Sequence, residues 1–223
     1  KKVEFLDLAE CSALADLRHI AQLTGPISLD LAWRETTAPL DATEPDNNPA
    51  EPQVHFADPA LGLAVTDLTP LAALTRLYSL DLTGCAQAKS LDGVQGLANL
   101  TVLHLDAFAE ITDLAPLAAL TGLVELDLRG CKKLTDLRPL AALGQLESLT
   151  LRGCESVSDL APVAKLAQLH TLDLSRCAKV TDLKPLAGLA QLDTLWLDGC
   201  EGVSDLAPLA ALTSLTFLNL QDC

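Results

Sequence analysis

The stretch "LVELDLRGCKKLTDLRPLAALGQ", residues 123–145, decides the fold, because the stretch that follows repeats it. Residues 146–168 read "LESLTLRGCESVSDLAPVAKLAQ", with leucines, a cysteine and a proline at the same places. A fixed period of roughly 20 to 50 residues is typical of arrays in which each copy is one structural unit. The repeat therefore predicts an array of similar structural units.

The phrase L-x-x-L-x-L returns at this spacing from Leu77 to Leu220. Three degraded copies precede it, with the landmarks Val3/Leu6/Leu8 and Cys11, Leu29/Leu31 and Arg34, and Val54/Phe56 and Pro59. The copies predict about ten strands in one array over residues 1–223, irregular at 34–64. Residues 34–53 lack the usual second half of the unit. They are expected to form a loop, either an interaction loop or the remnant of a decayed repeat.

The second half of each unit predicts a short α or 3-10 helix. Pro139, Pro162 and Pro185 suit a first helical turn, where no backbone N–H is needed. Apolar residues follow each proline at helical spacing. A unit of one strand and one such helix cannot bury its apolar face alone, so neighbouring units must stack around a continuous core.

The phrase L-x-x-L-x-L-x-x-C resembles the leucine-rich repeat, and "LTDLxPLAxLxxL" is similar to the bacterial internalin type. This α/β repeat family implies a right-handed solenoid, shaped as a horseshoe or arc. Its parallel sheet would line the concave face, with short α or 3-10 segments on the convex face. The family mostly binds proteins on the concave face. The chain departs from the internalin pattern where cysteine replaces the usual asparagine.

Composition limits the possible partners. The net charge of −15 argues against nucleic acid, whose backbone needs clustered lysine and arginine. No apolar run approaches the ~20 residues that span a bilayer, so membrane insertion is not expected. The chain lacks methionine, and neither end carries a polar cap. We therefore expect an excerpt of a longer protein, or ends covered by another chain.

All seven cysteines occupy one slot of the repeat: Cys11, Cys85, Cys131, Cys154, Cys177, Cys200 and Cys223. A catalytic cysteine would be singular, and a zinc site would need paired ligand spacing. We predict buried small residues that support the fold, whose S–H groups donate to the backbone. Buried thiols give a weak preference for a reducing compartment and leave the localisation open.

Outward positions of the predicted sheet hold the candidate functional residues. Carboxylates and imidazoles alternate along Asp30, His55, Asp81, His104 and Asp127. These are ligand types for divalent metals, although "LDL" is also ordinary repeat phrasing.

The expected partner-binding residues are Trp196, Arg129, Arg152, Asp127, Asp173, Asp198, Tyr78 and Phe217. Two stacked arginines either clamp an acidic group of a partner or pair with Asp106, Asp127 and Glu147. An outward tryptophan is a candidate anchor, with Tyr78, Phe5 and Phe217 in the next column.

No Walker loop, dinucleotide fingerprint, zinc-protease motif or nucleophile elbow is present in the sequence. The leading hypothesis is a non-enzymatic module without cofactors, which recognises another protein or a flanking domain of the same chain. The alternative is part of an enzyme, through a concave metal site or as the targeting domain of a multidomain effector or signalling enzyme.

Overall fold

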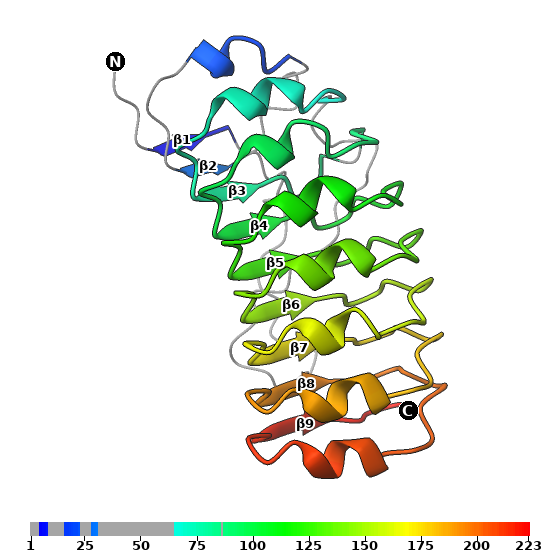
Figure 1. Cartoon of the computed structure of the whole chain (residues 1–223). Helices are drawn as coiled ribbons and strands as arrows, with labels where there is room; N and C mark the ends of the chain where they lie inside the picture. Colours follow the sequence, from blue (N-terminus) through cyan, green and yellow to red (C-terminus); the bar gives the residue numbers. More distant parts are fainter. Residues whose placement is uncertain (1–4, 9–15, 23–27, 31–64, 86) are drawn as a thin grey trace, which may run out of the picture.

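The computed structural model describes residues 5–8, 16–22, 28–30, 65–85 and 87–223. Its strands form one parallel sheet in which spatial order follows chain order (Figure 1). The strands are β1 (Phe5–Asp7), β2 (Ser28–Asp30), β3 (Ser79–Asp81), β4 (Val102–His104), β5 (Glu125–Asp127), β6 (Ser148–Thr150), β7 (Thr171–Asp173), β8 (Thr194–Trp196) and β9 (Phe217–Asn219). This sheet confirms the predicted strands from Leu77 onward.

The register reproduces the sequence repeat, since Leu80 pairs with Leu103 and each later central leucine pairs with the next. Ser28 of β2 pairs directly with Ser79 of β3. The predicted copy at Val54 and Phe56 lies outside the described residues, so its place in the array stays a prediction. Residues 31–64 lie outside the described part of the chain, and with them His55 and the predicted loop at 34–53.

The return segments of the described units are 3-10 helices and not α-helices, the two forms that the sequence left open. They are η1 (Ile20–Gln22), η2 (Thr69–Ala73), η3 (Val94–Gly96), η4 (Ala115–Ala119), η5 (Arg138–Ala142), η6 (Val163–Lys165), η7 (Lys184–Gly188) and η8 (Ala207–Ala211). As predicted, Pro139 and Pro185 stand in the first turn of η5 and η7, whereas Pro162 is the N-cap residue of η6. Leu143, which caps the end of η5, donates its N–H to the carbonyl of Leu140 at 2.9 Å, the tight pattern of a 3-10 turn.

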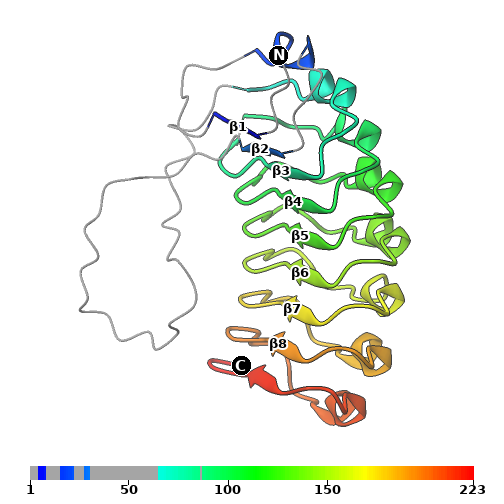
Figure 2. The same cartoon turned by 90° about the vertical axis from the view of Figure 1, so that its left-hand side faces the viewer.

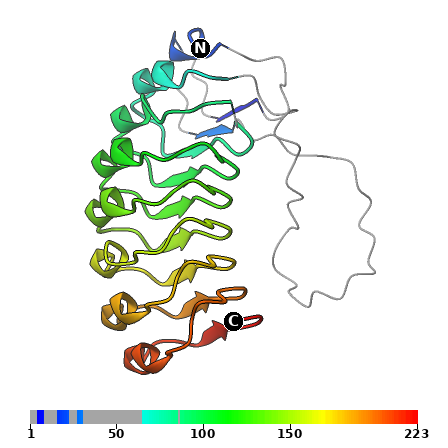
Figure 3. The same ribbon diagram turned by 90° about the vertical axis from the view of Figure 1, so that its right-hand side faces the viewer.

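The two layers stack into a gently curved solenoid. Figure 2 shows the strands on the inner side of the arc and the 3-10 helices outside, and Figure 3 shows the same layers from the opposite side. Leucines from both layers fill the space between them, and Leu80, Leu103 and Leu149 are fully buried. Burying a leucine contributes about 1.5–3 kcal/mol, so each unit depends on its neighbours for its share of the core.

The cysteine slot belongs to this interior. Cys131, Cys154, Cys177 and Cys200 are fully buried, and each Sγ donates to a leucine carbonyl of the preceding unit at 3.0–3.7 Å. Burial raises the pKa of the Cys131 and Cys200 thiols to about 12, so they hold their protons at neutral pH. These are the structural thiols that the sequence indicated.

The remaining members of the slot differ from one another. Cys85 is also fully buried. Cys223 keeps the hydrogen bond, with its Sγ 3.1 Å from the carbonyl of Leu197, but the residue is exposed, so the prediction of burial is wrong there. The reason is that none of the described units packs over it. Cys11 lies outside the described part of the chain.

Candidate functional site

The third residue of each strand from β3 to β9 belongs to one column on the concave face, which we call the concave column. Its members are Asp81, His104, Asp127, Thr150, Asp173, Trp196 and Asn219. Four of them, Asp81, Asp127, Asp173 and Asn219, accept the backbone N–H two residues later at 2.8–3.0 Å. The recurring acidic residue therefore has a structural role, because it closes the turn after the strand. Residues of the column that do not close the turn are therefore the better candidates for a function.

His104 is one of these and lies between two carboxylates. Its Nε2 is 2.9 Å from Glu125 Oε1, and its Nδ1 is 3.6 Å from Asp81 Oδ2. The contact with Asp81 raises the pKa of His104 to about 9, with burial opposing the rise and Glu125 adding to it. Burial alone would raise the pKa of Asp81, but His104 and Thr83 lower it overall. At neutral pH the imidazole is therefore a cation.

This charge state competes with the metal hypothesis, because a metal ligand must be a neutral imidazole. Within the described residues no group of three histidine, cysteine or acidic side chains is placed to hold an ion. Asp30 stands beside Asp81 in register, so within the described sheet the expected alternation is present only over Asp81, His104 and Asp127. The sequence did not point to Glu125, which lies in the neighbouring outward column.

A second cluster surrounds Arg129, two residues beyond the concave column. Its Nη2 is 3.7 Å from Asp127 Oδ2, and its buried Nε has no hydrogen-bond partner among the described residues. Asp106 is 5% exposed, and its Oδ1 likewise has no partner there. Burial raises the pKa of Asp106 to about 7, with repulsion from Asp127 adding and Arg129 offsetting part. Asp127 thus pairs with Arg129, as one of the two expectations had it.

Arg152 follows Arg129 in this second column. Burial raises the pKa of Asp173, and the positive charge of Arg152 opposes that rise. Arg152 thus stands close enough to the concave column to affect the protonation of Asp173. Glu147, five residues before Arg152 in the sequence, is exposed. The role of the arginines in holding an acidic partner group stays a prediction.

Trp196 differs most from the other residues of the concave column, most of which accept a backbone N–H of the turn. Its indole has no oxygen with which to accept a turn N–H, so the repeat loses that contact here. The ring is half-buried and packs on Phe217 of β9, with centroids 4.4 Å apart and planes tilted by 45°. Phe217 is itself 40% exposed. The structure thus brings two predicted anchors together as one aromatic pair.

Carboxylates border this pair. Asp173 is the register partner of Trp196 on β7, and Asp198 follows two residues after Trp196. Ser175 Oγ lies 2.5 Å from an oxygen of each carboxylate, although one hydroxyl donates only one proton. Ser175 was missed from the sequence, because a serine in a turn is common and signals nothing by itself.

The placement of Tyr78 corrects an expectation. It precedes β3, whereas Phe217 is the first residue of β9 and shares its column with Ser79. Tyr78 is 46% exposed, and the strands β4 to β7 separate it from Trp196. It therefore does not add to the aromatic pair. The side chain of Phe5 lies outside the described part.

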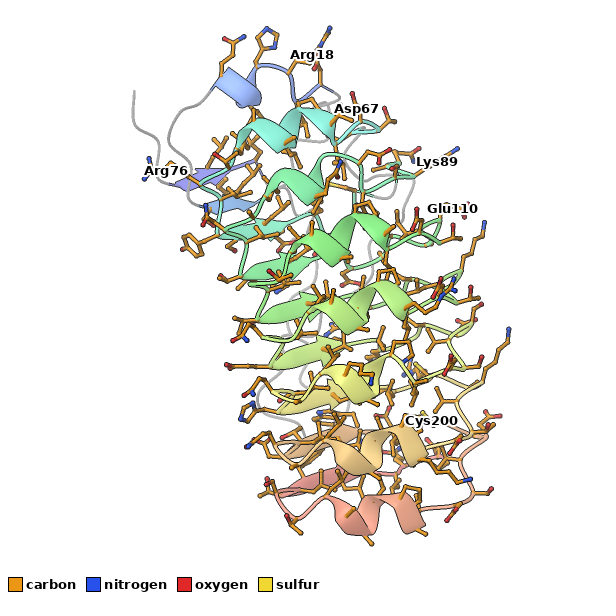
Figure 4. All side chains as sticks on the ribbon, viewed as in Figure 1. Arg18, Asp67, Arg76, Lys89, Glu110 and Cys200 are labelled. Atoms are coloured by element: carbon orange, nitrogen blue, oxygen red, sulfur yellow. The ribbon has the colours of Figure 1, made fainter. Side chains whose placement is uncertain are left out.

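Another row of charges follows one edge of the stack. Figure 4 shows Arg18, Asp67, Lys89 and Glu110 one after another along that edge. Glu110 accepts a hydrogen bond from Lys133 Nζ at 2.7 Å. Exposed ion pairs of this kind contribute about 0–1 kcal/mol, so they accompany the repeat without defining a site.

The layered repeat, the single parallel sheet and its outward columns together define a leucine-rich-repeat solenoid. Comparison with solved structures narrows the class. Internalin C2 from Listeria monocytogenes matches with a TM-score of 0.71 and 29% identity, over 98% of this chain and 80% of that one. Internalin InlF from the same organism matches with a TM-score of 0.65 and 23% identity, over 99% of this chain and 61% of InlF. The chain is an internalin-like leucine-rich-repeat protein, as the sequence indicated.

A third match, to a complex of TLR13 with a single-stranded RNA, has a TM-score of 0.63 and 20% identity, over 92% of this chain and 26% of TLR13. This match shows the fold alone. Because that protein is in a complex with RNA, the fold does not exclude nucleic acid, and the expectation that this chain binds none rests on its charge.

No family model and no curated protein matches the chain. None of the described helices is long and apolar enough to cross a membrane.

Proposed function

We propose that the chain is a non-enzymatic protein-recognition module that binds its partner on the concave face of the sheet. The observation that carries the proposal is the Trp196–Phe217 pair. At the position of Trp196 most other units place a side chain that closes the turn, and here an aromatic surface replaces it. Aromatic side chains are enriched among the residues that dominate binding energy.

The surroundings of the pair fit this role. Leucine and cysteine close the core of each unit, so the concave face can vary without loss of the fold. Asp198, which is partly exposed, accepts a hydrogen bond from Asn219 of β9, so a carboxylate lies beside the strand that carries Phe217. An aromatic anchor within a charged rim is the usual anatomy of a protein interface.

The test compares two variants that each remove an apolar side chain from the surface. Trp196→Ala alters the concave face. Leu206→Ala removes a leucine that is 42% exposed and precedes η8 in the other layer. Crosslinked partners of each variant and of the parent chain are quantified from the source cell or its host, after both variants are shown to melt cooperatively.

We expect the concave variant to lose at least about ten-fold of the captured partner, the usual effect of losing one anchor residue, and the control variant to lose little. Equal capture by the parent chain and the concave variant would place recognition elsewhere and refute the proposal.

A further inference from the structure

We propose that the corner formed by Trp196, Phe217 and Asp198 binds an arginine side chain of the partner. Asp173 is only 5% exposed, so it does not contact the ligand itself. This inference rests on the proposed function and deepens it. It names the chemistry of one contact on the concave face, a guanidinium group that stacks on the indole and donates to Asp198.

The aromatic surface of the corner is suited to a guanidinium group. Trp196 is half-buried, and Phe217 braces it at a centroid distance of 4.4 Å. A braced ring loses little freedom when a ligand stacks on it, and indole is the side-chain ring that attracts cations most strongly. A planar guanidinium stacks on such a ring, whereas an ammonium group offers only a compact charge.

The negative charge beside the ring also favours arginine. The single hydroxyl proton of Ser175 cannot satisfy Asp173 and Asp198 at once. Asn219 Nδ2 donates to Asp198 only at 3.4 Å, and Asp198 forms no ion pair within the described part of the chain. A carboxylate held by neutral donors beside an aromatic ring is suited to a donor with a positive charge.

The net charge of the whole molecule also favours a basic ligand. The chain carries 30 acidic against 15 basic residues. Such an excess attracts a basic partner over a distance of about one Debye length and repels an acidic one. The corner supplies a place where that attraction becomes a specific contact.

The experiment titrates the chain with three blocked hexapeptides, of arginine, lysine and glutamate, by calorimetry at about 150 mM salt, where the Debye length is ~8 Å. We expect the arginine peptide to bind several-fold more tightly than the lysine peptide and the glutamate peptide not to bind. Trp196→Leu and Asp198→Asn should each weaken arginine binding about five- to ten-fold, on the order of 1–1.4 kcal/mol.

Glu201→Gln is the matched control for Asp198→Asn, because it removes one carboxylate from an exposed turn close by in the chain. It should change binding less than about two-fold, the size of unspecific attraction. If Trp196→Leu fails to melt like the parent chain, Phe217→Leu takes its place, since it removes the brace of the ring. Binding that is absent, or that Asp198→Asn and Glu201→Gln weaken equally, overturns the arginine assignment.

The two proposals fail separately. Loss of partner capture in the Trp196→Ala variant together with no arginine preference leaves the recognition face standing and removes only this contact. If arginine binds at the corner but the Trp196→Ala variant captures as much partner as the parent chain, the proposed function is refuted instead.

Discussion

The interior cysteine slot and the concave column repeat with the same spacing, yet they differ in what they tolerate. Between Cys85 and Cys200 the slot holds cysteine with one departure, Phe108, which is equally apolar and 1% exposed. The concave column accommodates aspartate, histidine, threonine, tryptophan and asparagine. The backbone repeats in both, so the difference lies in burial. Packing constrains the slot, and only the turn hydrogen bond constrains the column.

The largest expected loss of stability comes from a substitution in the cysteine slot. Phe108→Ala removes a buried aromatic ring between neighbouring units and leaves a cavity. The free energy of unfolding should fall by about 4 kcal/mol. Urea denaturation followed by circular dichroism measures it. The matched change in the column, Thr150→Ala, should cost less than about 0.5 kcal/mol, the usual effect at a partly exposed site. Similar losses for the two variants would contradict the contrast between slot and column.

The next effect concerns Asp106, a carboxylate close to the column but buried like the slot. Its native pKa of about 7 lies above the ordinary value of 3.8, so the folded chain binds the extra proton. The contribution of Asp106 to stability should therefore fall as pH rises from about 4 to 7 and stay constant above that range. Asp106→Asn cannot ionise, so it should be more stable than the parent at pH 8 by on the order of 3 kcal/mol. Urea midpoints at pH 4, 6 and 8 test this, and an unchanged pH dependence would contradict it.

The leucine phrase predicted the fold because burial alone enforces it. Every leucine of the phrase between Leu77 and Leu197 lies in the core, and its register follows from the spacing. The pattern is weaker before Leu77. Val54 and Phe56 match the phrase loosely, and the spacing alone did not predict that Ser28 pairs directly with Ser79.

The site was less predictable, because a column fixes which residues are neighbours and not which atoms meet. Trp196 and Phe217 were found as outward aromatic residues, and their contact needed the structure. Tyr78 was predicted to share the column of Phe217 but lies one residue before it, because the sequence does not distinguish an aromatic residue just before a strand from one inside the strand. Glu125 was missed because its approach to His104 depends on the length of its side chain, which no spacing reveals.

A smaller effect sharpens the comparison inside the column. His104 has its pKa raised to about 9 in the folded chain, against an ordinary value of 6.5. The resulting stabilisation is present below pH 6.5 and is lost as pH rises through about 9. Its side chain is 32% exposed, so screening limits the contribution to about 1 kcal/mol.

His104→Gln should therefore destabilise the chain at pH 6 and leave it unaffected at pH 10. Glu125→Gln should reproduce part of the loss. A nuclear magnetic resonance titration of the His104 ring checks the pKa directly, and a midpoint at the ordinary value of 6.5 would remove the basis of this prediction.

The last effect, of about the same size, lies in the turn that precedes the slot, where the backbone conformation favours glycine. Gly84, Gly130, Gly153 and Gly199 have φ between +68° and +77°, whereas Ala107, Arg176 and Asp222 occupy the equivalent position with φ between +56° and +64°. Alanine in this left-handed region costs about 1 kcal/mol relative to glycine. Ala107→Gly should therefore raise stability by about 1 kcal/mol.

Gly153→Ala makes the reverse substitution at the equivalent position of another unit. A Cβ at this glycine would meet only Gly130, at 3.9 Å, so the added methyl group has room and its cost is conformational alone. It should lower stability by about the amount that Ala107→Gly gains. Changes of opposite sign and similar size in the urea midpoint would show that this turn position is set by φ. Two changes of the same sign would mean that the side chain at Ala107 contributes packing which the backbone argument omits.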